Sequence, residues 1–169
     1  MSRFDPPVIS SPPSRNGIFV FPVNLLDPQN LGSIIRSAAF YGCAGLITSL
    51  KHSCDYTPIV SKASAGSMEL FDGLFRTKSP LQFIKSAKES GFHVIGTGLS
   101  REIKPVNNSN PCNPKILLLL GNEGAGLSPE ILSLCDENLV IPSRNPSYLD
   151  SLNVGVATGI LLDRLQNKL

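Results

Sequence analysis

Residues 18–40 read IFVFPVNLLDPQNLGSIIRSAAF, a buried strand that passes through a short turn into a helix. The run Ile18–Phe21 is continuously apolar, which is typical of a strand covered on both faces. Asp27-Pro28 suits the turn, Asn30 suits the N-cap of the helix, and Gly42 suits its end. This stretch therefore predicts the first strand–helix unit of an α/β protein.

The same alternation of apolar strands and helices continues to the end of the chain. Because such strands are buried on both faces, they predict a parallel sheet flanked by helices. Residues 1–15 are rich in Pro and Ser and predict a flexible tail or linker, so that residues 16–169 form the folded domain. The elements are expected in the order helix 30–41, strand 45–48, helix 80–90, strand 92–97, strand 115–120, a short helix from 128, strand 139–141 and helix 150–165.

Composition leaves many function classes open and closes a few. With 169 residues, 41% of them hydrophobic and 17% charged, the chain suits one globular domain. A net charge of +2 neither requires nor excludes a nucleic-acid partner, and the apolar runs are too short to cross a membrane. We expect reduced thiols and no metal, because no Cys-x-x-Cys pair or zinc spacing occurs among Cys43, Cys54, Cys112 and Cys135.

The first segment with unusual polar residues is Asn24–Ala38. A turn and a helix cap account for Asp27 and Asn30, and Gly32 allows a close approach of the backbone. These explanations leave out Arg36, which follows two isoleucines and precedes small residues. A cation in such surroundings usually has a dedicated partner. A structural ion pair and a functional role are therefore equally compatible with the pattern.

Two further segments share this character. Residues 117–126 form an apolar strand followed by a Gly-x-x-Gly-x-Gly loop that contains Glu123. The spacing differs from the dinucleotide motif Gly-x-Gly-x-x-Gly and from a P-loop, so a tight structural turn is the default and a ligand-binding loop the alternative. In the third segment, Ser151 and Asn153 lie near the start of the closing helix, where helix caps are the ordinary interpretation.

Taken together, the three segments resemble a known family. Asn24–Ala38, Gly121–Gly126 and Ser151–Val154 are similar, in this order, to the three motifs of the SpoU (TrmH) branch of the SPOUT RNA methyltransferases. The resemblance covers nearly the whole chain after Gly17. Residues 53–69 look most like the mitochondrial large-subunit ribosomal RNA guanosine ribose methyltransferases and their bacterial relatives.

This resemblance implies a catalytic domain over residues 16–169 that transfers a methyl group from S-adenosylmethionine to a ribose 2′-hydroxyl of RNA. The implied substrate is a guanosine of large-subunit ribosomal RNA, and the implied location is the mitochondrion, otherwise the cytoplasm. The resemblance also implies a homodimer and a deep trefoil knot in the C-terminal third, although knots are rare enough to be excluded by default. Many relatives carry an additional N-terminal RNA-binding domain, so we expect this chain to be a catalytic portion.

The resemblance assigns roles to individual residues. Those implied to hold the cofactor are Thr97, Gly121, Asn122, Ile141 and Leu152. Those implied to form the reaction centre are Arg36, Asn30, Glu123, Ser151 and Asn153. Arg36 would act as a base, anchor a phosphate or stabilise developing alkoxide charge, and Glu123 would orient it. Two departures concern the cofactor loops: Ser143-Arg144 follows Ile141-Pro142 where the family usually has an apolar residue, and Gly155 stands where Ser is common.

Three other functions fit parts of the pattern. A tRNA ribose 2′-O-methyltransferase would use the same motifs. A catalytically inactive RNA-binding relative is disfavoured because the polar site residues are all present. A nucleotide-binding oxidoreductase is disfavoured because the glycine spacing is wrong for it.

Overall fold

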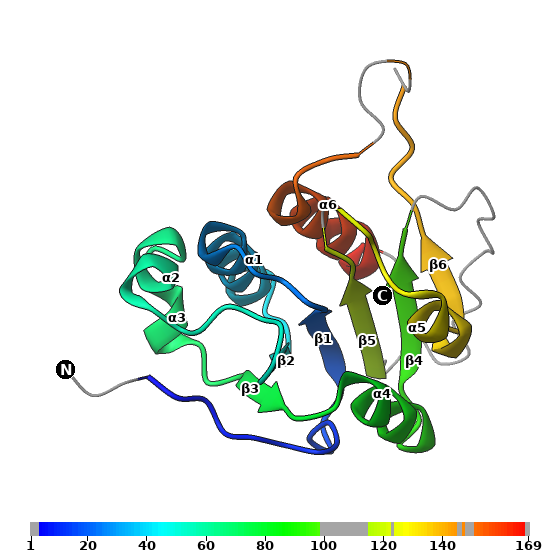
Figure 1. Ribbon diagram of the computed structural model, residues 1–169, viewed down its shortest axis with the longest axis horizontal. Coiled ribbons are helices and arrows are strands. Elements are labelled where there is room, and N and C mark those ends of the chain that lie inside the picture. The colour runs from blue at the N-terminus through cyan, green and yellow to red at the C-terminus, as the bar shows by residue number, and fades with distance from the viewer. Residues whose placement is uncertain (1–3, 99–114, 123, 145–146, 148–150, 168–169) are drawn as a thin grey trace.

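The computed structural model describes residues 4–98, 115–122, 124–144, 147 and 151–167. The strands within these ranges form a single sheet in the order β3-β2-β1-β5-β4-β6, and every pairing between neighbouring strands is parallel (Figure 1). The parallel α/β sheet predicted from the sequence is therefore confirmed. The strands are β1 Gly17–Pro22, β2 Gly45–Ser49, β3 Leu74–Thr77, β4 His93–Thr97, β5 Lys115–Leu120 and β6 Glu137–Leu139.

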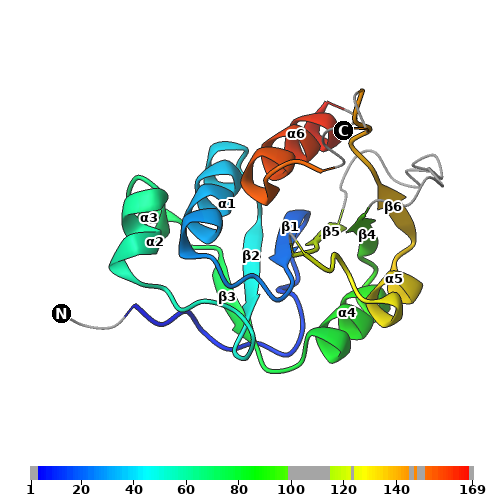
Figure 2. The ribbon, with the colours of Figure 1, turned by 45° about the horizontal axis from the view of Figure 1, so that its top comes forward.

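Helices cover both faces of this sheet. On one face α1 packs against α6, with α2 and α3 beside α1, and α4 and α5 cover the other face (Figure 2). In the described residues no helix is long and apolar enough to cross a membrane. The helices are α1 Pro28–Phe40, α2 Pro58–Ala63, α3 Ser67–Leu70, α4 Pro80–Glu89, α5 Pro129–Leu134 and α6 Val154–Gln166.

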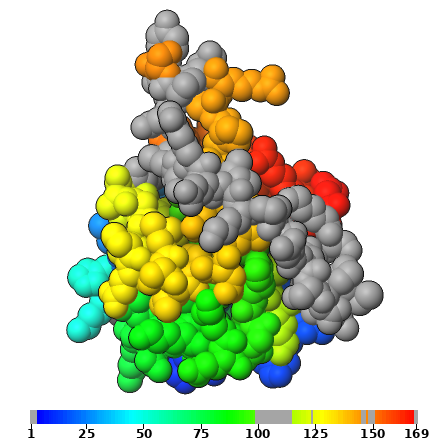
Figure 3. Space-filling model, turned by 90° about the vertical axis from the view of Figure 1, so that its right-hand side faces the viewer, coloured from blue at the N-terminus to red at the C-terminus, as the bar shows by residue number. Residues whose placement is uncertain are grey.

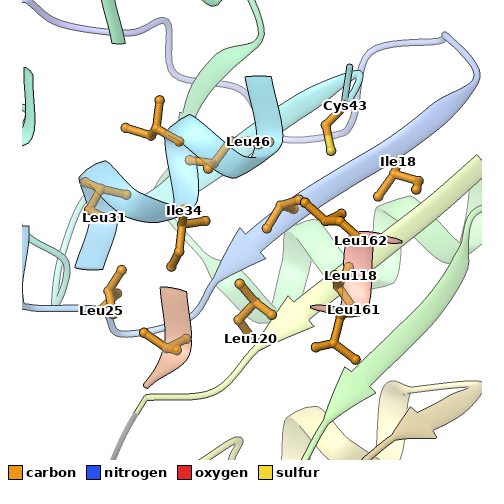
Figure 4. Close-up of a cluster of buried hydrophobic side chains, with 14 of the residues drawn as sticks. Ile18, Leu25, Leu31, Ile34, Cys43, Leu46, Leu118, Leu120, Leu161 and Leu162 are labelled. Carbon is orange, nitrogen blue, oxygen red and sulfur yellow. The ribbon is translucent and has the colours of Figure 1, made fainter. Parts of the chain in front are cut away.

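The two faces of the sheet hold separate hydrophobic cores, because successive side chains of a strand point to opposite faces. Ile18 and Val20 of β1 belong to the core under α1 and α6, and Phe19 and Phe21 belong to the core under α4 and α5. Figure 4 shows the first core, where residues of β1, β2 and β5 meet α1 and α6. The continuously apolar run Ile18–Phe21 thus supplies both cores.

The structure corrects the helix start predicted at Asn30. Helix α1 begins at Pro28 and its N-cap is Asp27, whose Oδ1 accepts a hydrogen bond from the Gln29 amide at 2.7 Å. Proline in the first turn needs no amide partner, so the helix can begin two residues earlier. Asn30 is buried inside the first turn rather than at the cap.

Other boundaries also differ from prediction. Helix α6 begins at Val154 rather than at residue 150, because Asn153 caps it, and β6 lies two residues earlier than predicted. The elements between residues 58 and 77, namely α2, α3 and β3, were not predicted. Gly32 does allow the predicted close approach, since a Cβ there would lie 2.4 Å from the Cβ of Ala63 in α2.

Residues 4–9 lie along β3, the edge strand of the sheet. The Arg76 amide donates to the Pro7 carbonyl at 2.9 Å, and the Ile9 amide donates to the Arg76 carbonyl at 2.8 Å. The buried Arg76 guanidinium also forms ion pairs with Asp5 at 3.2 Å and Asp55 at 3.1 Å. These contacts cover the edge of the sheet. The division of the chain into a tail and a domain stays a prediction.

Candidate functional site

A pocket of about 430 Å³ opens at the carboxyl ends of β4, β5 and β6. Its walls come from Thr97 at the end of β4, residues 120–122 and 124–127 at and after the end of β5, residues 139–141 at and after the end of β6, and residues between 151 and 161 at the start of α6. Figure 3 views the side of the molecule where α5 and β6 lie, with residues 124–144 in yellow and orange. Parallel α/β sheets bind ligands at this edge, and the volume falls within the range of about 300–1,000 Å³ typical of small-molecule sites.

Side chains at the ends of β4 and β5 hold the pocket loop in place. The Thr97 hydroxyl donates to the Leu119 carbonyl at 3.0 Å and accepts from the Gly121 amide at 3.3 Å, which fastens the two strand ends together. The Asn122 side-chain oxygen accepts from the amides of Gly124 at 3.2 Å and Ala125 at 2.7 Å. Such an Asx turn lets an Asn side chain replace a backbone partner and fixes the loop.

The first and third segments of the sequence meet through a pair of asparagines. Asn153 donates from Nδ2 to Oδ1 of Asn30 at 2.9 Å. Its own Oδ1 accepts from the Gly155 amide at 2.9 Å and the Val156 amide at 3.4 Å, which caps α6. Asn153 is therefore both the expected cap and the link between α1 and α6. Neither asparagine lines the pocket, although Asn153 stands in the sequence between two residues that do, Leu152 and Val154.

The structure brings most of the predicted site residues together. All five residues predicted to hold the cofactor line the pocket, and so does Ser151. Arg36 is exposed on α1 and does not line it. Within the described ranges the Arg36 guanidinium has no hydrogen-bond or ion-pair partner. Glu123, its predicted orienting group, lies outside the described residues.

Sequence reasoning missed the apolar walls of the pocket. Val154, Ala157 and Leu161 point into it from α6, and their spacing of three and four residues marks one helix face. Leu127 and Leu132 close it from the side of α5. Ser143-Arg144, a departure from the family pattern, does not line the pocket, whereas the apolar residues 139–141 before it do.

The titratable groups of the described chain limit the chemistry. None of the described residues that line the pocket has an ionisable side chain, so these residues supply neutral donors, acceptors and apolar contacts. Burial raises the pKa of the Cys43 thiol to about 12 and those of Cys54 and Cys135 to about 11. These three cysteines are free but protonated at neutral pH, which removes them as nucleophiles.

The second departure, Gly155, has a structural reason. A Cβ at this position would lie 2.5 Å from Oγ of Ser33 and 2.9 Å from its Cβ, because α1 and α6 pack closely there. A serine at position 155 would therefore clash with Ser33. Gly155 on α6 leaves room for the Ser33 hydroxyl on α1. The close packing of the two helices helps to place Asn153 beside Asn30.

We expect Gly155→Ala to destabilise the fold by about 1–3 kcal/mol, the usual cost of overpacking. Gly159→Ala is the matched control one turn later in α6, because its Cβ would meet only Ser37 Oγ at 4.0 Å. Alanine favours a helix over glycine, so the control should be neutral or stabilising by up to about 1 kcal/mol. Urea unfolding of both variants measures the difference. Equal stabilities would contradict the packing argument.

The sheet, its two helical layers and the pocket define an α/β protein with a small-molecule site at the carboxyl edge. The sequence pattern of the SpoU rRNA Methylase family matches residues 17–163. Over 149 residues the chain is 40% identical to "rRNA methyltransferase 1, mitochondrial" of Dictyostelium discoideum, covering 83% of this chain and 27% of the relative. Over 147 residues it is 42% identical to the human protein of the same name, covering 80% and 41%.

Solved structures are similar as well. An AdoMet-bound rRNA methyltransferase from Sinorhizobium meliloti superposes with a TM-score of 0.80 at 29% identity, covering 93% of this chain and 58% of that one. A TrmH/SpoU tRNA modifying enzyme from A. aeolicus gives 0.75 at 28% identity, covering 91% and 76%. The chain belongs to the SpoU rRNA methylase family. It spans 27% and 41% of the length of the two curated relatives described above.

Proposed function

We propose that this chain transfers a methyl group from S-adenosylmethionine to a ribose 2′-hydroxyl of ribosomal RNA. One observation carries the proposal: residues from parts of the chain far apart in the sequence line one pocket, among them all five expected to hold the cofactor. Asn153, the sequence neighbour of the lining residues Leu152 and Val154, is hydrogen-bonded to Asn30. Similarity to rRNA methyltransferases over most of this chain supports it. The relatives' names favour ribosomal RNA over transfer RNA, and the complete set of polar residues in the sequence disfavours an inactive relative.

The residues of the pocket fit this cofactor. Leu152 and Ile141 offer apolar contacts for an adenine ring, and the backbone after Gly121 offers polar groups in a loop that Asn122 fixes. The Thr97 hydroxyl braces that loop. When bound, S-adenosylmethionine supplies a sulfonium methyl group that needs no further activation. The neutral side chains of the described lining residues suit it, because such a donor requires no acid or base from the residues that hold it.

The protein then has to align the ribose oxygen with the methyl group and to stabilise the charge that develops on that oxygen. A ribose oxygen has to lie behind the methyl group at roughly 3–3.5 Å, and its proton has to leave. We assign alignment to Ser151, which lines the pocket, and to the hydrogen-bonded pair Asn30 and Asn153. Because the described lining residues carry no ionisable group, we assign the charged role to Arg36, which does not line the pocket, and to Glu123. Arg36 would stabilise the developing alkoxide or anchor a phosphate.

The proposal extends to the substrate and to the place of action. The relatives from Dictyostelium discoideum and Homo sapiens are both named mitochondrial rRNA methyltransferases, which supports a mitochondrial location for this chain. We infer a guanosine of large-subunit ribosomal RNA as the modified nucleotide from the similarity over residues 53–69. We also infer that the C-terminal third forms a trefoil knot, with the loops around the pocket as its parts.

Mapping ribose methylation tests the proposal. Ribosomal RNA from cells with and without this protein is compared at every 2′-position, and one guanosine of the large subunit should lose its methyl group. The purified full chain should also bind S-adenosylmethionine in calorimetry. An unchanged methylation map, or a protein that binds neither the donor nor its demethylated product, would rule the proposal out.

We further propose a homodimer, with α1 and α6 at its interface. Three large apolar side chains on or beside these packed helices are exposed: Phe40 at 82%, Val156 at 54% and Leu152 at 47%. Exposed apolar side chains along a pair of packed helices commonly mark an interface. Such an interface would also cover the face of α1 that carries Arg36, one turn before Phe40.

Light scattering at micromolar concentration should give the mass of a dimer. Val156→Glu buries a charge in the proposed interface and should shift the protein to a monomer. Leu70→Glu is the control, since Leu70 is 84% exposed on α3, away from α6, and this variant should stay dimeric. A monomer mass for the unmodified chain, or a dimer that survives Val156→Glu, would contradict the arrangement.

A further inference from the structure

We propose that a small pocket at the N-terminus of helix α4 binds a backbone phosphate of the RNA substrate, an inference that rests on the proposed function and adds a second contact to it. The pocket measures about 270 Å³ and lies where β3 ends and the chain turns into α4 (Figure 1). Residues 8–10 line it as well, and it shares no described lining residue with the cofactor pocket. The volume lies below the range of about 300–1,000 Å³ typical of small-molecule sites, so a single phosphate group fits better than a metabolite.

One wall of this pocket carries a buried hydroxyl group that the fold does not use. Thr77, the last residue of β3, lines the pocket and is only 2% exposed. Its side chain faces α4, because it lies two residues after Phe75, which packs against the core on that side of the sheet. Within the described residues its hydroxyl has no hydrogen-bond partner. Buried polar groups without partners are uncommon and need an explanation, and a ligand in the pocket supplies one.

The neighbouring strand carries a second hydroxyl of this kind. Ser49 lies beside Thr77 in the parallel register of β2 and β3, and it faces the same side of the sheet as Ile47 two residues earlier. It is 1% exposed, and its Oγ has no hydrogen-bond partner in the described part of the chain. Ser49 does not line the pocket. Of the two hydroxyls, that of Thr77 is therefore the one placed to contact a ligand, and Ser49 provides a matched comparison.

The other groups around the pocket favour an anion. None of its described lining residues carries a carboxylate. The Lys78 ammonium is exposed and has no ion-pair partner in the ranges that the structure describes. Helix α4 begins at Pro80 and runs for ten residues, so its first turn places a partial positive charge at this end. Lysines, hydroxyl groups and helix N-termini are common phosphate ligands. Besides Thr77, the polar lining residues are Ser10, Lys78, Ser79 and Gln82.

The position of this pocket suits an RNA strand that reaches the methyl-transfer site. Because all strand pairings are parallel, the end of β3 lies at the same edge of the sheet as the cofactor pocket. Strand β5 is the third strand along from β3, which corresponds to roughly 14 Å at about 4.8 Å between neighbouring strands. A nucleic-acid strand in a helix carries one phosphate about every 3.4 Å. The bound phosphate would then lie about four nucleotides from the modified ribose.

Fluorescence anisotropy of a short labelled single-stranded RNA with the full chain tests this inference. Lys78→Gln should weaken binding by about fivefold at low salt, the scale of one exposed ion pair. It should also lower the slope of log affinity against log salt concentration by about 0.7, as expected for one lost phosphate contact. Lys85→Gln is the matched control, because Lys85 is exposed on α4 and does not line the pocket. This variant should change the affinity by less than about twofold.

A second pair of variants tests the buried hydroxyl. Thr77→Val removes it with little change of shape and should weaken RNA binding by about fivefold. Because this hydroxyl has no partner among the described residues, the melting temperature should stay unchanged or rise by about 2–4 °C. Ser49→Ala removes the neighbouring hydroxyl, which does not line the pocket, and should leave the RNA affinity within about twofold.

Three results would overturn the inference. Equal weakening by Lys78→Gln and Lys85→Gln would show a general charge effect, and a lowered melting temperature of Thr77→Val would show that the hydroxyl has a structural partner. If Lys78→Gln weakened binding of inorganic phosphate in calorimetry and left RNA binding unchanged, the pocket would hold the free ion instead. Failure of the proposed function would be seen separately, as loss of S-adenosylmethionine binding, because that cofactor is assigned to the other pocket.

Discussion

Arg36→Lys should fold normally, bind S-adenosylmethionine with unchanged affinity and lose methyl transfer by at least about a hundredfold. The side chain is exposed on α1 and has no partner among the described residues, so the fold does not depend on it there. It also does not line the pocket, which is why cofactor affinity should be kept. Lysine preserves the charge but loses the planar fork that contacts a phosphate or an alkoxide through two donors.

Single-turnover methylation of ribosomal RNA measures the loss, and calorimetry measures the affinity for the cofactor. Arg164→Lys is the control, because Arg164 is also exposed and lies in the last turn of α6. It should change neither quantity by more than about twofold. An unfolded Arg36→Lys variant would mean that Arg36 is a structural ion-pair residue after all. Near-normal turnover by Arg36→Lys would show that the catalytic assignment of Arg36 is wrong. Glu123 would then be the better candidate for the charged role, and Asn30 would contribute to methyl transfer by alignment.

Part of the fold follows from the sequence because the two central strands, β1 and β5, are short continuous apolar runs. Residues 18–21 and 115–120 could be recognised without any knowledge of their neighbours, since burial on both faces requires that pattern. Strand β3 could not, because its four residues include Arg76. That arginine is buried only because Asp5 and Asp55 neutralise it from 71 and 21 residues away in the sequence. No local pattern reports a partner at such a distance.

Some residues of the candidate site could likewise be placed from the sequence, and others could not. Residues next to the ends of apolar strands, such as Thr97 and Gly121, could be placed at the carboxyl edge from the strand pattern alone. The bond between Asn30 and Asn153 joins positions 123 residues apart, and each residue alone resembles an ordinary helix cap. The resemblance to a family assigned both residues to one site, whereas their positions in the predicted helices did not. The close contact between Gly155 and Ser33 could be recognised only from the structure, because it depends on how α1 and α6 pack.

The other large effect is expected at the loop that follows β5. A Cβ on Gly121 would lie 2.6 Å from the carbonyl carbon of Gly126, 2.8 Å from its Cα and 2.8 Å from the Leu127 amide nitrogen. All three atoms belong to the backbone, so no side chain can turn aside to make room. The loop doubles back on itself at this point, with the Asn122 carbonyl accepting a hydrogen bond from the Gly126 amide at 3.1 Å.

Gly121→Ala should therefore push residues 122–127 away from the position in which they line the pocket. Overpacking of this kind costs about 1–3 kcal/mol, which corresponds to a loss of roughly fivefold to 150-fold in affinity for S-adenosylmethionine if the shift falls on the binding loop. Gly124→Ala is the control in the same loop, because its Cβ would approach only the Asn122 side-chain oxygen, at 4.0 Å. Calorimetry should find its affinity within about threefold of the unmodified chain. Equal affinities for the two variants would mean that the loop tolerates displacement, and that contacts from 139–141 and 151–161 hold the cofactor without it.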